Sequence, residues 1–367
     1  MNRYDVVVVG GRVAGASTAL LLARAGARVA LIDRSRPGSD TVSTHGLMRA
    51  GVLQLSRWGL LDQIVAAGTP PIRSTTFHYP NRPTVHVAIR PSPGVDALYA
   101  PRRHLLDWLL VDAAAQAGVH VITDTAVTAL RSDSHGRVRG VHVVSRGGEP
   151  CRAAGVDNCG RGRHPLHRRH ADPAPVVQRG RSRSAVLYRY LTNMAADGYE
   201  WAYGAGTAAG LIPTNHAQTC VFVSTTPERM RASAPHRRRA RLRRRARPSG
   251  PCISRTRCRS RAGQFDLRMG RNTRLCPPIL GPGWALVGDA GYYKDPITTH
   301  GMTDALRDAE LLADAIIESI AGETPEAQAL ARYQQARDRL SSGHFAATEG
   351  VAAYDWNPDD IDGLYGA

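Results

Sequence analysis

Residues 4–33 read YDVVVVGGRVAGASTALLLARAGARVALID, and this stretch decides the fold. Residues 4–9 end in an apolar run of four valines at 6–9, which is typical of a parallel strand buried on both faces. Residues 14–25 are strong helix formers, Gly26 ends this helix, and residues 28–32 form a second apolar strand. The stretch therefore predicts a strand–turn–helix–strand unit that can hold the ADP half of a dinucleotide.

The glycine-rich turn of this unit is suited to a pyrophosphate, because it exposes backbone N–H groups at a helix N-terminus. Gly15 lets the helix approach the strand closely, and Asp33 is placed to accept a hydrogen bond from the adenosine ribose. Arg12 stands at the middle glycine of the usual G-x-G-x-x-G pattern, where it either contacts a phosphate or points outward. An ordinary βαβ turn is the alternative, but the strands, the helix and the terminal acid together favour dinucleotide binding. The candidate cofactor-binding residues here are Gly10, Gly11, Arg12, Ala14, Gly15, Asp33 and Arg34.

The formal net charge of +17 comes from two short stretches. Residues 231–275 hold 16 Arg and one acid, for +15, and residues 151–172 hold five Arg and two acids, for +3. The remainder of the chain therefore carries −1, so the protein is not uniformly basic and nucleic acid is not the expected partner. No apolar run is long enough to span a bilayer, and the N-terminus does not resemble a signal peptide. We expect a cytoplasmic protein without a membrane partner.

Three further segments carry a family resemblance. Residues 101–107 read PRRHLLD, and residues 284–291 read WALVGDAG, which predicts a strand that ends in Gly-Asp-Ala-Gly. Residues 294–302 read KDPITTHGM ahead of a helix. Together with residues 4–33, they resemble the FAD-dependent monooxygenases of the para-hydroxybenzoate hydroxylase type, including their geranylgeranyl reductase relatives. Residues 40–46, DTVSTHG, are similar to a branch of the same group.

The resemblance implies further flavin-binding positions. It places Asp289 at the ribityl and pyrophosphate region, Arg103 near the flavin with Arg102 as the adjacent alternative, and Val127 on the strand that meets adenine. The helix that follows Gly301 would direct its positive N-terminus at the pyrimidine edge of the flavin. The implied binding residues are Arg103, Val127, Gly288, Asp289, Ala290, Pro296 and Gly301. His45 and His300 are the candidates for a catalytic role, although a lone histidine is more often structural.

The resemblance implies a fold class and a division into domains. The fold is α/β, a glutathione reductase-type Rossmann-like FAD domain with an inserted antiparallel β-rich substrate domain. The predicted bounds are 1–75, 100–175 and 276–345 for the FAD domain, 76–99 and 176–235 for the substrate domain, and 346–367 for a C-terminal tail.

The Arg-rich segments 151–172 and 236–275 do not fit this fold. They are a solvated insert, an arm that binds an anionic surface, or a stretch of gene read out of frame. We favour the third hypothesis, because a one-base shift of one codon choice for residues 163–170 (RHPLHRRH) encodes GIRSTVA, a peptide of the kind that follows the family's Asp-Gly motif. The histidines of that stretch are therefore not assigned to a metal, and no metal is expected.

The expected activity follows from the resemblance. NAD(P)H would reduce FAD, and the reduced flavin would activate O2 and transfer oxygen to a small organic substrate. The first alternative is a flavin-dependent reductase of isoprenoid double bonds. The second, from another class, is an inactive FAD-fold remnant or a nucleic-acid-binding protein that uses the Arg-rich segment.

Overall fold

The computed structural model describes residues 3–36, 38–41, 43, 45–146, 150–155, 178–194, 196–233, 266–269, 274–275 and 279–356. Most of the two Arg-rich segments, including residues 163–170, lies outside these residues, so the out-of-frame hypothesis stays a prediction.

The N-terminal unit forms as the sequence predicts. Strand β2 (Val6–Val9) pairs in parallel with β3 (Val29–Ile32), and β3 pairs in parallel with β6 (His120–Ile122). Helix α1 (Val13–Arg24) connects β2 to β3 and packs against α4 (Arg103–Gln116) and α7 (Gly301–Ile320). Val6, Val7 and Val8 of β2 are almost fully buried, because helices cover one face of this sheet and a second sheet covers the other.

The second sheet has the strand order β1-β9-β8-β7. Its strands are β1 (Arg3–Tyr4), β7 (Thr125–Ser132), β8 (Val138–Ser145) and β9 (Pro150–Gly155). β7, β8 and β9 are antiparallel, whereas β1 runs parallel to β9. Val127, Val141 and Val143 pack on Val7 and Ile32 of the parallel sheet, which places β7 beside the glycine-rich unit.

The largest sheet has seven strands in the order β15-β11-β14-β13-β12-β4-β5. They are β4 (Ser74–His78), β5 (Val85–Ala88), β11 (Ala185–Thr192), β12 (Tyr199–Gly204), β13 (Thr207–Thr214), β14 (Gln218–Thr225) and β15 (Asp266–Met269). All neighbours are antiparallel except β12 and β4. Two distant parts of the chain thus share one sheet. The predicted fold class is confirmed, while the domain bounds stay a prediction.

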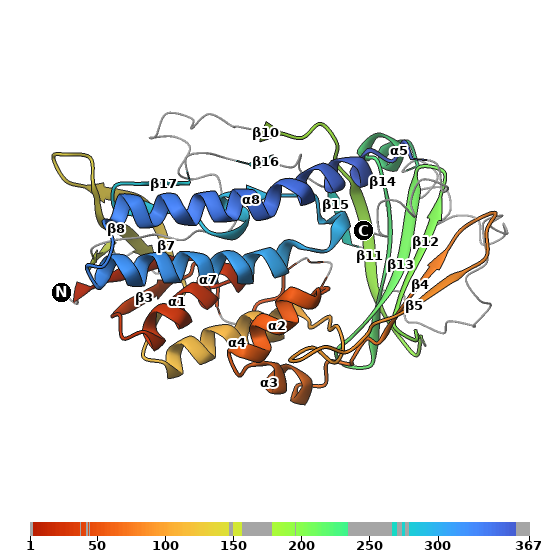
Figure 1. Ribbon diagram of the computed structural model, residues 1–367, viewed down its shortest axis with the longest axis horizontal. Helices are drawn as coiled ribbons and strands as arrows, with labels where there is room; N and C mark the ends of the chain where they lie inside the picture. The colour runs from red at the N-terminus through yellow and green to blue at the C-terminus, as the bar shows by residue number, and fades with distance from the viewer. Residues whose placement is uncertain are drawn as a thin grey trace.

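The remaining elements connect these layers. They are α2 (Arg49–Arg57), α3 (Leu61–Ala66), α5 (Pro227–Ala232), α8 (Glu326–Ala353), β10 (Gln178–Arg179), β16 (Arg274–Leu275), β17 (Leu280–Gly281), β18 (Trp284–Ala285), β19 (Tyr292–Tyr293) and the 3-10 turns η2 (Gly288–Ala290) and η3 (Pro296–Thr298). Figure 1 shows the seven-stranded sheet at one end of the molecule, with α7 and α8 running lengthwise toward it.

One expected strand is shorter than predicted. The segment before the Gly-Asp motif forms only the two residues of β18, and then the chain turns. Gly288 causes the turn, since its φ of 59° lies in the left-handed region that favours glycine.

Candidate active site

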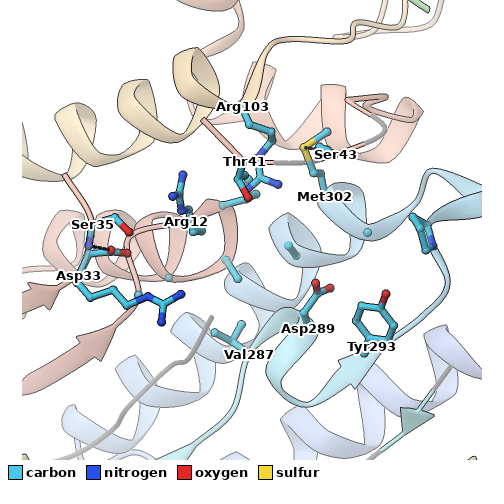
Figure 2. A pocket seen from close by; sticks show the side chains of 18 of the residues that line it. Arg12, Asp33, Ser35, Thr41, Ser43, Arg103, Val287, Asp289, Tyr293 and Met302 are labelled. Atoms are coloured by element: carbon cyan, nitrogen blue, oxygen red, sulfur yellow. Dashed lines mark hydrogen bonds between the residues drawn. The ribbon is translucent and has the colours of Figure 1, made fainter. Parts of the chain in front are cut away.

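A long cavity joins the parallel sheet to the seven-stranded sheet. Figure 2 shows Asp33 and Ser35 toward one side of it, Arg12 between, and Asp289, Tyr293 and Met302 toward the other. Most predicted binding residues line it. They are Gly10, Arg12, Ala14, Gly15, Asp33, Arg34, Arg103, Val127, Asp289, Pro296 and Gly301. Five other candidates are not in its lining, namely Gly11, Gly288, Ala290, His45 and His300.

The glycine-rich turn depends on two glycines for different reasons. Gly10 has φ 105°, which strains any side chain. A Cβ on Gly15 would lie 2.0 Å from the carbonyl oxygen of Gly10, so only glycine lets α1 approach β2 this closely. Arg12, in contrast, has an extended backbone with φ −100° and ψ −177°. This conformation suits any L-residue and explains why arginine can replace the usual middle glycine.

Asp33 holds the turn from the end of β3. Its Oδ2 accepts a hydrogen bond from Gly11 N at 2.5 Å, and its Oδ1 accepts one from Ser35 N at 2.6 Å. Each carboxylate oxygen can accept a second hydrogen bond, so the side chain can fix the turn and still receive a ribose hydroxyl. Gly11 therefore contributes to the site by donating a hydrogen bond to Asp33, and it does not line the cavity.

The Gly-Asp motif packs directly on this turn. A Cβ on Gly288 would lie 2.9 Å from the Cβ of Ala14, which brings the neighbouring Asp289 to the middle of the cavity. The first turn of α7 reaches the same cavity through Gly301 and Met302. Residues almost 300 positions apart in the chain thus contact one elongated space, as a bound dinucleotide requires.

The other end of the cavity is an apolar compartment beneath the seven-stranded sheet. It is lined by Val186, Tyr188, Ile212, Cys220 and Phe222 of β11, β13 and β14. Burial raises the pKa of the Cys220 thiol to about 12, so the thiol is neutral there. These residues alternate along their strands, but no sequence motif marks them as cavity residues.

Asp295 ties this sheet to the segment beside the cavity. Its carboxylate is fully buried and accepts hydrogen bonds from Ser184 N at 2.7 Å, Ser184 Oγ at 2.6 Å and Ile297 N at 3.0 Å. Burial raises its pKa, although the three donors act in the opposite direction. Ser184 directly precedes β11, so this contact positions Val186 and Tyr188 over the cavity.

The two candidate catalytic histidines are not among the residues that line the cavity. His300 Nδ1 contacts the carbonyl oxygen of Thr298 at 2.5 Å, and its ring lies 4.8 Å from that of His344. His45 is fully buried, with Nε2 against the hydroxyl of Tyr190. Burial, assisted by the positive charge of Arg102, lowers the pKa of His45 to about 3. A neutral His45 cannot serve as a general acid near pH 7.

His45 should make the protein sensitive to acid. Its folded-state pKa of about 3 lies below the ordinary 6.5, so its stabilising contribution is complete above pH 6.5 and is lost as pH falls. From pH 6.5 to pH 5 the loss is about 2 kcal/mol. Urea unfolding of His45→Gln is expected to show a flatter pH dependence over this range than the parent. Equal slopes of the free energy of unfolding against pH in the two proteins would mean that His45 does not titrate in this way.

Comparison with known proteins adds a family match for the N-terminal part of the chain. Residues 3–154 match the FAD binding domain family. The fold of the chain is that of the FAD-dependent monooxygenases. PqsL, a probable FAD-dependent monooxygenase from Pseudomonas aeruginosa, is similar over 100% of both chains, with a TM-score of 0.80 and 20% identity.

Two curated relatives differ in how much of this chain they match. The 6-methylpretetramide 4-monooxygenase of Streptomyces rimosus is 34% identical over 139 residues, which is 37% of this chain and 33% of that protein. The match therefore spans about a third of that relative. The digeranylgeranylglycerophospholipid reductase of Methanoculleus marisnigri is 26% identical over 354 residues, or 90% of this chain and 81% of that protein.

These matches confirm the predicted resemblance and the FAD-binding character of the N-terminal part. Within the residues that the structure describes, no helix is long and apolar enough to cross a membrane. Nor do those residues contain a group of three or more His, Cys, Asp or Glu that could hold a metal ion.

Proposed function

We propose that this protein is a NAD(P)H-driven monooxygenase that hydroxylates a small organic substrate with O2. The observation that carries the proposal is the continuity of the cavity from Asp33 and Arg34, through the turn at Gly15, to the apolar compartment under β11 and β14. A dinucleotide lying along the first part would end at the compartment, where a substrate can meet its reactive ring.

The residues present fit FAD. Asp33 would accept from the ribose, the turn from Gly10 to Gly15 and the N-terminus of α1 would receive the pyrophosphate, and Asp289 would accept from the ribityl chain. The positive end of α7 at Gly301 would face the ring. Bound FAD would supply the electron transfer and the reaction with oxygen.

The chain's own contribution is to orient the substrate and to exclude water from it. Tyr188, Ile212 and Phe222 give the compartment an apolar and partly aromatic wall, which favours a flat, weakly polar molecule. PqsL has been solved in complex with 2-aminobenzoylacetate, a small aromatic molecule that carries a carboxylate, which supports a substrate of that size class.

A second candidate is a flavin-dependent reductase of isoprenoid double bonds. The observation in its favour is the match to the digeranylgeranylglycerophospholipid reductase, which extends along 90% of this chain. An apolar compartment also suits an isoprenoid chain, so both functions fit this part of the cavity. The two functions differ in whether an oxygen atom enters the product.

Isotope labelling separates the two functions. The protein, loaded with FAD and supplied with NADH or NADPH, is incubated under 18O2 with small aromatic amines and ketones, starting with 2-aminobenzoylacetate. Monooxygenation predicts one 18O atom in the product and none from labelled water. Reduction of a geranylgeranyl lipid under anaerobic conditions, without labelled product in any oxygen experiment, would contradict the proposal and favour the reductase.

A further inference from the structure

A buried carboxylate on α4 connects two arginines of the cavity wall. Asp107 is 2% exposed, and its Oδ2 accepts a hydrogen bond from Arg12 Nη1 at 2.8 Å. Arg103 donates to the same carboxylate from Nε at 3.0 Å and from Nη2 at 3.1 Å. We call these three residues the Arg12–Asp107–Arg103 triad.

The triad carries a net charge of +1, and its two cations border the cavity whereas Asp107 does not. Figure 2 shows Arg12 and Arg103 in the cavity wall. The Arg12 side chain is 28% exposed and that of Arg103 is 7% exposed. A guanidinium has five N–H donors, so both arginines keep donors beyond those used on Asp107.

The contacts of the triad limit how far its arginines can move. Arg12 is also held by Ser39, whose carbonyl oxygen accepts from Nη1 at 2.8 Å and whose Oγ accepts from Nη2 at 3.0 Å. Arg103 lies one helical turn from Asp107, so its two hydrogen bonds are made within α4. Without the carboxylate between them, the two cations would repel each other and leave these positions.

The triad lies beside the turn that faces the pyrophosphate. Arg12 is the N-cap of α1 and occupies the fingerprint position that usually carries glycine, and the first turn of α1 contains no acid. A cation is therefore added at a place where backbone N–H groups and the helix dipole already favour an anion.

We propose that Asp107 is a positioning residue that holds Arg12 and Arg103 toward the diphosphate of the bound dinucleotide. The inference rests on the proposed FAD site and adds a carboxylate that does not touch the cofactor. Its effect on binding passes through the two arginines, because they contact the cavity and Asp107 does not.

The test compares ligands that do and do not carry the diphosphate. Dissociation constants for FAD, ADP and riboflavin are measured by calorimetry on the apoprotein of the parent and of Asp107→Asn. We expect FAD and ADP to bind roughly ten- to a hundredfold more weakly to the variant, since a charge-assisted contact is lost on each arginine. Riboflavin affinity is expected to stay unchanged. Asp112→Asn is the matched control, because Asp112 is also on α4 and accepts only from Gln116 Nε2, at 2.7 Å, among its described contacts.

A double-mutant cycle separates positioning from a purely structural role. In an Arg12→Met/Arg103→Met background, Asp107→Asn is expected to cause no further loss of ADP affinity. If Asp107→Asn does not fold, Asp107→Glu, which moves the carboxylate but keeps its charge, takes its place in the same cycle, with the same prediction of weaker ADP binding and unchanged riboflavin binding.

Two results would overturn the inference and leave the FAD site standing. One is parent-like ADP affinity in Asp107→Asn. The other is an equally large further loss of ADP affinity when Asp107→Asn is added to the Arg12→Met/Arg103→Met background. A parent protein that binds neither FAD nor ADP would instead overturn the proposed function, and the inference with it.

Discussion

The Gly15→Ala variant is expected to lose FAD almost completely. The added Cβ would lie 2.0 Å from the Gly10 carbonyl oxygen and 3.2 Å from its carbon, and both are backbone atoms that no side-chain rotation can move. Either α1 moves away from β2 or the turn opens, and each change displaces the N–H groups that would receive the pyrophosphate. We expect at least a hundredfold weaker FAD binding and a loss of about 3 kcal/mol in the free energy of unfolding.

Fluorescence titration of the apoprotein and urea unfolding check these two values. The matched control is Gly343→Ala, because Gly343 is in α8 and a Cβ there would meet no atom within 4 Å. That variant should bind FAD normally and gain about 0.5–1 kcal/mol of stability. Normal FAD affinity in Gly15→Ala would show that the close contact between helix and strand is not what shapes the binding turn.

The Asp295→Ala variant is expected to be strongly destabilised. It would leave Ser184 N, Ser184 Oγ and Ile297 N without their buried acceptor. Each unsatisfied buried donor is costly, so we expect a loss of about 3–4 kcal/mol in the free energy of unfolding. The start of β11 would also be released from η3, so Val186 and Tyr188 would no longer be held over the cavity.

The release of β11 can be measured separately from the loss of stability. At a urea concentration where the variant is still folded, hydrogen exchange at residues 185–192 is expected to accelerate in Asp295→Ala. Glu323→Ala, which removes an exposed carboxylate, is the control and should leave both readouts unchanged. Parent-like exchange and stability in Asp295→Ala would mean that Asp295 does not anchor the sheet.

Much of the fold was predictable because local patterns determine it. The four valines of β2, the helix formers of α1 and the acid at the end of β3 each point to the same unit, and the structure contains that unit. Asp289 could be placed near the turn because the Gly-Asp motif resembles a known family, and the tight contact of Gly288 with Ala14 shows how the two segments meet.

Other parts of the site depend on tertiary contacts that leave little trace in the sequence. Asp107 stands four residues after Arg103, a spacing typical of a helical ion pair, but its contact with Arg12 joins residues 95 positions apart. Cys220 and Phe222 line the cavity because they are on the face of β14 that borders it. Strand alternation puts them on one face but does not tell which face borders the cavity. His45 is buried with Nε2 against the Tyr190 hydroxyl, a contact across 145 positions that no sequence pattern predicts, and its catalytic role stays a prediction.

The absorption spectrum of the protein purified from its natural source, with identification of the released chromophore, tests the central claim most directly. We expect the two visible bands of an oxidised flavin, about one flavin per chain as a single bound dinucleotide requires, and release of FAD rather than FMN on unfolding. A colourless protein that also takes up no FAD from a large excess would contradict it.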